Sequence, residues 1–146
     1  MNSDLPARLA AIVELFASSP PRDRLELLLE YSRSLPLLPE AYAQHPERLQ
    51  AVPECQSPLF VATEVDADRR VHLYFDAPPE APTTRGFAGI FHAGLDGLGV
   101  DEVLAVPGDV TVRLGLGEVV SPLRLRGAVA LLDRVQRLLR AAEAAA

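Results

Sequence analysis

The chain has 146 residues, of which 49% are hydrophobic and 23% are charged, and this length and balance are those of a globular protein with a real core. Its net charge of -6 argues against nucleic-acid binding, which needs clustered Lys and Arg side chains against the phosphates. The first residues lack a secretory signal, and no apolar run approaches the roughly 18 residues that cross a bilayer. The single cysteine allows no internal disulfide. We therefore expect a cytoplasmic protein that contacts no membrane.

Two amphipathic helices are predicted between residues 4 and 35, where they form a helical hairpin. In the first helix, apolar residues recur at helical spacing: Leu5, Leu9, Ile12, Val13 and Phe16. Ser19 is expected to cap the second helix, with Pro20 in its first turn. The buried face of that helix is expected to hold Leu25, Leu28, Leu29 and Leu35.

Residues 36–58 form a proline-rich segment that contains Cys55 near its end. The segment holds five of the thirteen prolines and shows no hydrophobic periodicity, so a surface loop is predicted. Long loops of this kind are uncommon in compact proteins and are often functional.

A β-hairpin is predicted over residues 59–76, with strands at 59–65 and 71–76 joined by a polar turn. Val71, Leu73 and Phe75 share one face of the second strand, which we expect a layer of helices to cover. One hairpin makes a thin sheet, which leaves room for a short third strand near residues 49–53.

Residues 83–143 are predicted to be helical. Thr83 or Thr84 is expected to cap a helix that continues to about Leu95, and the many small residues of that helix indicate close packing against a neighbour. Short helices follow over 101–106 and 109–114, and Ser121-Pro122 opens the last helix. The apolar stripe of this helix is expected to be Leu125, Val129, Leu132, Val135 and Leu139. Strands clustered between helices predict one α+β domain over 1–146, with an antiparallel sheet of two to three strands.

Cys55 is the first candidate for chemistry. A lone cysteine is commonly a small buried hydrophobe. Here, however, Glu54, Gln56 and Ser57 surround it, and a proline lies at each end of this polar stretch, which indicates a loop tip with an accessible thiol. The carboxylate of Glu54 would oppose ionisation of the thiol, so activation has to come from elsewhere in the fold or from a partner.

The other candidate sites have little support. His45, His72 and His92 lack metal-ligand spacing with Cys55 or with one another, so no zinc site is expected. A Cys–His pair formed in space stays open. The glycines at 94, 97 and 99 do not have dinucleotide-binding spacing, and they follow a helix rather than a strand.

The order of short motifs resembles the SufE family of sulfur acceptor proteins. The motif around the cysteine is Val52, then Cys55-Gln56-Ser57, then Leu59 and Phe60. Further matches are Leu35-Pro36-Leu37-Leu38-Pro39-Glu40, Arg85-Gly86-Phe87, Leu114-Gly115-Leu116, and Ser121-Pro122-Leu123-Arg124 with Gly127. Two departures are Glu54, where the family has glycine, and Pro79-Glu80, where it often has Ser-Asp.

This resemblance implies a SufE/NifU-like fold and a persulfide carrier rather than a stand-alone enzyme. Cys55 would take sulfur from a SufS-like cysteine desulfurase, stimulate that enzyme, and relay the sulfur toward iron–sulfur cluster assembly on the SufBCD scaffold complex. Pyridoxal phosphate would stay on the desulfurase, so this chain, a monomer or homodimer, needs no cofactor. The expected partner-binding residues are Glu54, Gln56, Ser57, Arg85 and Arg124. The alternatives are a non-catalytic adaptor of the desulfurase and a redox-sensing thiol protein.

Overall fold

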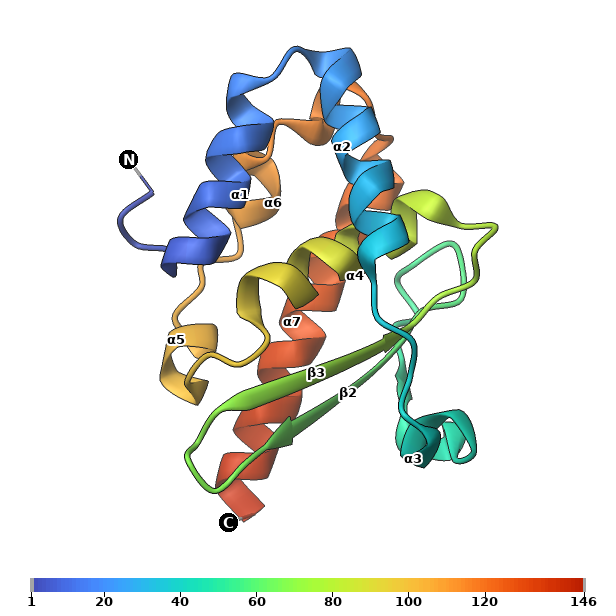
Figure 1. The fold of residues 1–146 in the computed structure, drawn as a ribbon, viewed down its shortest axis with the longest axis vertical. Helices are drawn as coiled ribbons and strands as arrows, with labels where there is room; N and C mark the ends of the chain where they lie inside the picture. Colours follow the sequence, from blue (N-terminus) through green and yellow to red (C-terminus); the bar gives the residue numbers. More distant parts are fainter. Residues whose placement is uncertain (1, 146) are drawn as a thin grey trace.

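The computed structural model describes residues 2–145, which contain seven α-helices and a three-stranded sheet (Figure 1). The helices are α1 (Ala7–Ser18), α2 (Pro21–Ser34), α3 (Glu40–Ala43), α4 (Pro82–Leu95), α5 (Val100–Leu104), α6 (Val110–Arg113) and α7 (Pro122–Ala145). The strands are β1 (Gln50–Ala51), β2 (Phe60–Val65) and β3 (Val71–Asp76), and two 3-10 turns are η1 (Pro46–Arg48) and η2 (Leu116–Glu118). The predicted α+β fold is therefore confirmed.

The sheet is antiparallel throughout and has the order β1-β2-β3, with β2 in the centre. Its register pairs Ala51 with Phe60 and Val61 with Phe75. The short third strand expected near residues 49–53 is present as β1.

One face of the sheet is buried against α4 and α7, and Figure 1 shows α7 crossing behind the β2–β3 hairpin. Val71, Leu73 and Phe75 alternate along β3 and are almost fully buried, as the pattern of the sequence predicts. They join the main core, to which α1, α2, α4 and α7 contribute most of the large side chains.

Part of the opposite face of the sheet, around Phe60, Ala62 and Tyr74, is covered by the chain between α2 and β1. Tyr42 of α3 stacks on Tyr74 of β3 with ring centroids 4.7 Å apart, and its hydroxyl donates a hydrogen bond of 2.5 Å to Glu64. The proline-rich segment 36–58 therefore contains α3, η1 and β1, although the sequence shows no hydrophobic periodicity there. These elements are too short for a periodic pattern to develop.

The small residues of α4 bring it close to α1 and α2, as expected. A Cβ atom added at Gly86 would lie 2.6 Å from the carbonyl oxygen of Leu28, and one at Gly89 would lie 2.1 Å from that of Tyr31. Any larger residue would push these helices apart.

Two predicted helix caps are wrong because α2 and α4 begin at Pro21 and Pro82, so that Ser19 lies one residue before the cap position and Thr83 and Thr84 lie inside the helix. The residues before α2 and α4 are Pro20 and Ala81, and neither Ser19 nor Thr83 or Thr84 caps a helix. The Ser19 hydroxyl instead donates to the carbonyl of Leu15 at 2.7 Å. At α7 the expected cap is present, because the Ser121 hydroxyl accepts a hydrogen bond of 3.3 Å from the N–H of Arg124.

Two residues expected in the core are on the surface. Leu25 is 38% exposed and Val129 is 42% exposed, because no element covers their sides of α2 and α7. Leu28 and Leu35 of the predicted set are buried, as are Leu132, Val135 and Leu139.

Candidate functional site

Cys55 lies in the loop that joins β1 to β2, at one end of the sheet. The N–H of Val52 donates to the carbonyl of Leu59 at 2.8 Å and closes this loop. Inside it, the N–H of Cys55 donates to the carbonyl of Val52 at 3.1 Å, which makes a tight turn through residues 53 and 54. The strand ladder therefore fixes the two ends of the loop and presents Cys55 at its tip.

The thiol of Cys55 points inward rather than toward solvent. Its Sγ lies 3.6 Å from the carbonyl oxygen of Gly127 in α7, and the side chain packs against the main core. The sequence predicted an accessible thiol from its polar neighbours, and that expectation is wrong, because the cysteine is only partly exposed and turns away from the loop surface.

Gly127 is what lets the loop approach α7 so closely. A Cβ atom at this position would lie 3.0 Å from the Sγ of Cys55, closer than carbon and sulfur atoms normally approach each other. Gly127 is one of the residues on which the resemblance to the SufE family rests, but only the packing shows that it touches Cys55.

The thiol lies in a small pocket between the loop and the first turns of α4 and α7. The pocket is lined by Cys55, Gln56, Leu59, Thr83, Thr84, Phe87, Arg124, Gly127, Ala128 and Leu131. Its volume is about 10 Å³, close to the smallest space that holds one water molecule. A second protein's cysteine cannot enter it while the loop keeps this position.

Both the burial of the thiol and the charge beside it disfavour ionisation. Burial raises the pKa of Cys55, and the carboxylate of Glu54 raises it further, to about 11. At pH 7 about one molecule in ten thousand carries a thiolate. The effect of Glu54 has the expected direction, but the sequence did not reveal the larger effect, which is burial.

Arg124 is the cation of this site. It is the third residue of α7, it lines the Cys55 pocket, and its guanidinium makes no hydrogen bond or ion pair with another side chain or carbonyl of residues 2–145. A partly exposed, unengaged guanidinium beside a thiol can contact an approaching anion or a carboxylate of a partner.

The other predicted partner-binding residues are placed differently. Gln56 lines the pocket, while Glu54 and Ser57 lie on the loop outside it. Arg85 is in the first turn of α4, where its guanidinium donates to the carbonyls of Ala77 at 2.6 Å and Ser32 at 3.3 Å. This arginine ties the start of α4 to the end of α2. The sequence did not single out Thr84 or Phe87 as pocket residues, because helical periodicity predicts a cap and a core residue there.

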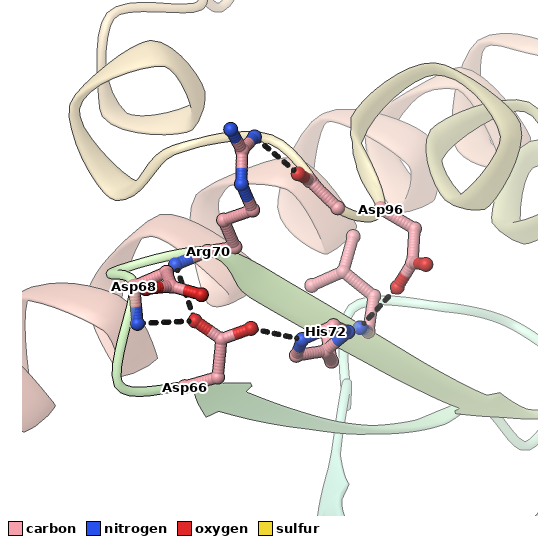
Figure 2. A network of polar contacts seen from close by, with 7 residues as sticks. Asp66, Asp68, Arg70, His72 and Asp96 are labelled. Atoms are coloured by element: carbon pink, nitrogen blue, oxygen red, sulfur yellow. Dashed lines mark hydrogen bonds and ion pairs between the residues drawn. The ribbon is translucent and has the colours of Figure 1, made fainter.

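No histidine is among the residues that line the Cys55 pocket. His45 pairs with Glu47, and His92 lies 3.8 Å from Asp96. Figure 2 shows that His72 contacts Asp66 at 2.9 Å, and that the same carboxylate accepts hydrogen bonds from the N–H groups of Asp68 and Arg70. His72 therefore helps to hold the turn between β2 and β3.

The described residues also hold no cluster suited to a metal. Across residues 2–145, three or more His, Cys, Asp or Glu side chains do not gather at one point in a way that could bind an ion. Nor does any helix in this range combine the length and the apolar character needed to span a bilayer.

Comparison with known proteins identifies the family. A family model described as "Fe-S metabolism associated domain", that of SufE, matches residues 10–139. The chain belongs to the SufE family. This result confirms the resemblance that the motifs around Cys55 and Arg124 suggested, and it links the protein to iron–sulfur metabolism.

Relatives support the SufE assignment over nearly the whole chain. An uncharacterised SufE-like protein of Mycobacterium tuberculosis is 50% identical over 141 residues, which is 97% of each chain. The chloroplastic/mitochondrial SufE-like protein 1 of Arabidopsis thaliana is 33% identical over 92% of this chain and 35% of its own length. The solution structure of a hypothetical protein from Thermus thermophilus superposes with a TM-score of 0.83 at 41% identity, covering 96% of this chain and 98% of that one.

Proposed function

We propose that this protein accepts sulfur on Cys55 as a persulfide from a cysteine desulfurase and relays it toward iron–sulfur cluster assembly. The observation that supports the proposal best is the position of the only cysteine, which lies at the tip of a β-hairpin loop, beside the unengaged Arg124, in a SufE-family chain. One thiol can carry one sulfane sulfur, whereas a cluster needs several ligands.

The transfer is an exchange at sulfur. The Cys55 thiolate attacks the terminal sulfur of a persulfide on the desulfurase cysteine, and a new S–S bond forms on Cys55. The bond between the two sulfurs of the donor breaks, and the desulfurase thiolate leaves. No net oxidation or reduction occurs, and pyridoxal phosphate is needed only on the partner.

The resting geometry requires the loop to open before this step. The pocket is too small for a second cysteine, and the thiol is protonated at neutral pH. Opening exposes the thiol and removes the main cause of its high pKa. The cost is modest because the side chains of Glu54, Gln56 and Ser57 make no hydrogen bond with residues 2–145, so the loop leaves mainly apolar contacts and the Sγ–Gly127 contact.

Intact-mass spectrometry after incubation with a desulfurase and cysteine tests the carrier role. We expect the chain to gain the mass of one sulfur atom, and a thiol reductant should remove it. The Cys55→Ser variant is the matched control and should gain nothing. An unmodified wild-type chain under turnover conditions contradicts the proposal.

The buried, protonated thiol is the observation that favours the alternative of a non-catalytic adaptor. The same variant separates the two functions, since a Cys55→Ser protein that stimulates the desulfurase as fully as the wild type leaves only the adaptor role. A peroxide-sensing role has less support, because such cysteines are exposed and have a low pKa.

The remaining expectations belong to the same proposal. We place the protein in the cytoplasm, with a SufS-like desulfurase as donor and the SufBCD scaffold complex as acceptor. It needs no cofactor of its own, and it works as a monomer or homodimer.

A further inference from the structure

A second surface feature lies on the far side of α7 from Cys55. Gly127 and Leu131 face the Cys55 pocket, whereas Val129, two residues from each, faces a groove between α6 and α7. The groove has a volume of about 500 Å³, within the range of natural binding clefts.

The walls of this groove are apolar and open to solvent. Val112 of α6 is 74% exposed, and Val129 of α7 is 42% exposed. Leu125 completes the α7 wall one helical turn before Val129. Two exposed valines that line the same concave surface are a feature of interaction sites rather than of an ordinary solvated face.

The charged residues that line the groove sum to zero, but the charge left without a partner within residues 2–145 is positive. The two charged residues are Arg126 and Asp133. Asp133 is paired with Arg137 at 2.8 Å, whereas the guanidinium of Arg126 has no ion-pair or hydrogen-bond partner within residues 2–145. The whole of α7 carries five arginines and two acids, a net charge of +3 in a chain whose net charge is -6. The helix is thus the basic surface of an acidic protein.

A polar group at the wall of the groove lacks a partner. The side chain of Thr111 is 1% exposed, and its hydroxyl makes no hydrogen bond with any described residue. A buried hydroxyl in this state lowers the stability of the free protein. Gln136 lies beside it and uses its amide N–H groups on the carbonyls of Val103 and Val106.

We propose that this groove docks an acidic amphipathic helix of a partner protein. The apolar face of such a helix covers Val112 and Val129, and an acidic side chain at its edge pairs with Arg126. A second copy of this chain is the weaker candidate, because a symmetric contact would place α7 and its positive charge against itself.

Two synthetic amphipathic peptides of about 15 residues, the length at which an isolated helix becomes marginally stable, provide the probe. Both have a Leu-rich apolar face, and their polar faces carry only Glu or only Lys. Titration into the ¹⁵N-labelled full chain should shift the amide signals of Val112, Thr111 and Val129 with the Glu peptide. The Lys peptide should bind about tenfold more weakly or not at all.

Matched variants assign the binding to the groove. Arg126→Glu should lose the Glu peptide, while Arg140→Glu, an equal charge change on the same helix outside the groove, should keep most of the affinity. Val112→Ser should weaken binding, and Leu37→Ser, a change at an exposed apolar residue outside the groove, should not. Thr111→Val should raise the midpoint of thermal unfolding of the free protein, because it removes the unpaired hydroxyl.

Three results would overturn the inference: equal affinity for the two peptides, signal shifts confined to other surfaces, or Arg126→Glu and Arg140→Glu behaving alike. Self-association of the wild type in sedimentation that Val112→Ser abolishes would also overturn it, because the occupant would then be a second copy of this chain.

Discussion

At the scale of single residues, two neighbours of Cys55 disfavour the thiolate form of its side chain, by different means. Gly127 permits the close approach that buries the sulfur, and Glu54 adds a negative charge next to it. Each effect can be removed separately, because Gly127 is in α7 and Glu54 is in the loop.

Gly127→Ala should accelerate alkylation of Cys55 by iodoacetamide. The new methyl group displaces the sulfur toward solvent, which lowers the pKa that burial had raised. We expect the alkylation rate at pH 8 to rise roughly tenfold, because at a pH below the pKa a fall of one unit in the pKa raises the thiolate fraction about tenfold. Alanine is also the better helix former, so the protein stays folded.

Gly117→Ala is the matched control, because a Cβ atom there would have only an ordinary contact, 3.8 Å from Leu125. An alkylation rate in Gly127→Ala equal to that in Gly117→Ala would show that the glycine does not set the position of the thiol.

Glu54→Gln should lower the pKa of Cys55, though not to that of a free cysteine, since burial is the larger cause. At any pH below about 11 the thiolate fraction rises as the pKa falls. The alkylation rate at pH 8 should therefore rise, by less than roughly tenfold. The pH profile of alkylation measures this shift, with Glu14→Gln in α1 as control. A profile that does not move contradicts the electrostatic role of Glu54.

The sequence singled out Cys55 and Arg124, which line the same pocket, but it could not give the direction of the thiol. Polar neighbours in the chain suggested exposure. Its real environment comes from Phe87 of α4 and Gly127 of α7, and the latter lies 72 residues further along the chain. Contacts between residues so far apart in the sequence leave no local sequence pattern that could predict them.

At the scale of elements, the crossing of α2 and α4 holds the helical layer together. The two helices touch through Gly86 and Gly89, with no room for a side chain between them. Close contact of this kind places the first turn of α4, and with it Thr84, beside the Cys55 loop.

Gly89→Ala should destabilise the protein strongly. Its methyl group would lie 2.1 Å from the carbonyl oxygen of Tyr31, and because that atom belongs to the backbone, the helices have to separate. We expect a loss of about 3 kcal/mol in the free energy of unfolding, measured by urea denaturation. Gly108→Ala has open space around it and should change stability little. Equal stabilities for the two variants would refute the role of the crossing.

The longer elements follow from the sequence because their residues repeat at a regular spacing. Both strands of the hairpin and α1, α2, α4 and α7 were predicted within a few residues. The wrong predictions concern the neighbours of an element, or elements too short to show a pattern. Leu25 and Val129 belong to apolar stripes that no neighbour covers, and α3, η1 and β1 are shorter than a recognisable pattern.

At the scale of the whole molecule, positive and negative charges are unevenly distributed between α7 and the rest of the chain. The chain is acidic overall, yet α7 is basic, and its first turn brings Arg124 to the Cys55 pocket. A partner that approaches the thiol therefore meets a positive charge at the edge of the pocket and the negative charge of Glu54 on the loop.

Arg124→Ala should weaken binding to the desulfurase about tenfold, a cost of roughly 1.4 kcal/mol. Arg140→Ala, at the other end of the same helix, should bind as the wild type does. Isothermal titration calorimetry at two salt concentrations measures both, and higher salt should reduce the difference between them. If both variants lose affinity equally, the effect belongs to the charge of the helix rather than to a contact at the pocket.

The contact between Gly127 and Cys55 also has an evolutionary consequence. An alanine at residue 127 would favour the helix by up to about 1 kcal/mol, so glycine persists there only while a cysteine loop needs the space. A descendant that lost Cys55 would be free to replace this glycine. The two positions should therefore change together across lineages, and sequences that retain the glycine without the cysteine should be rare.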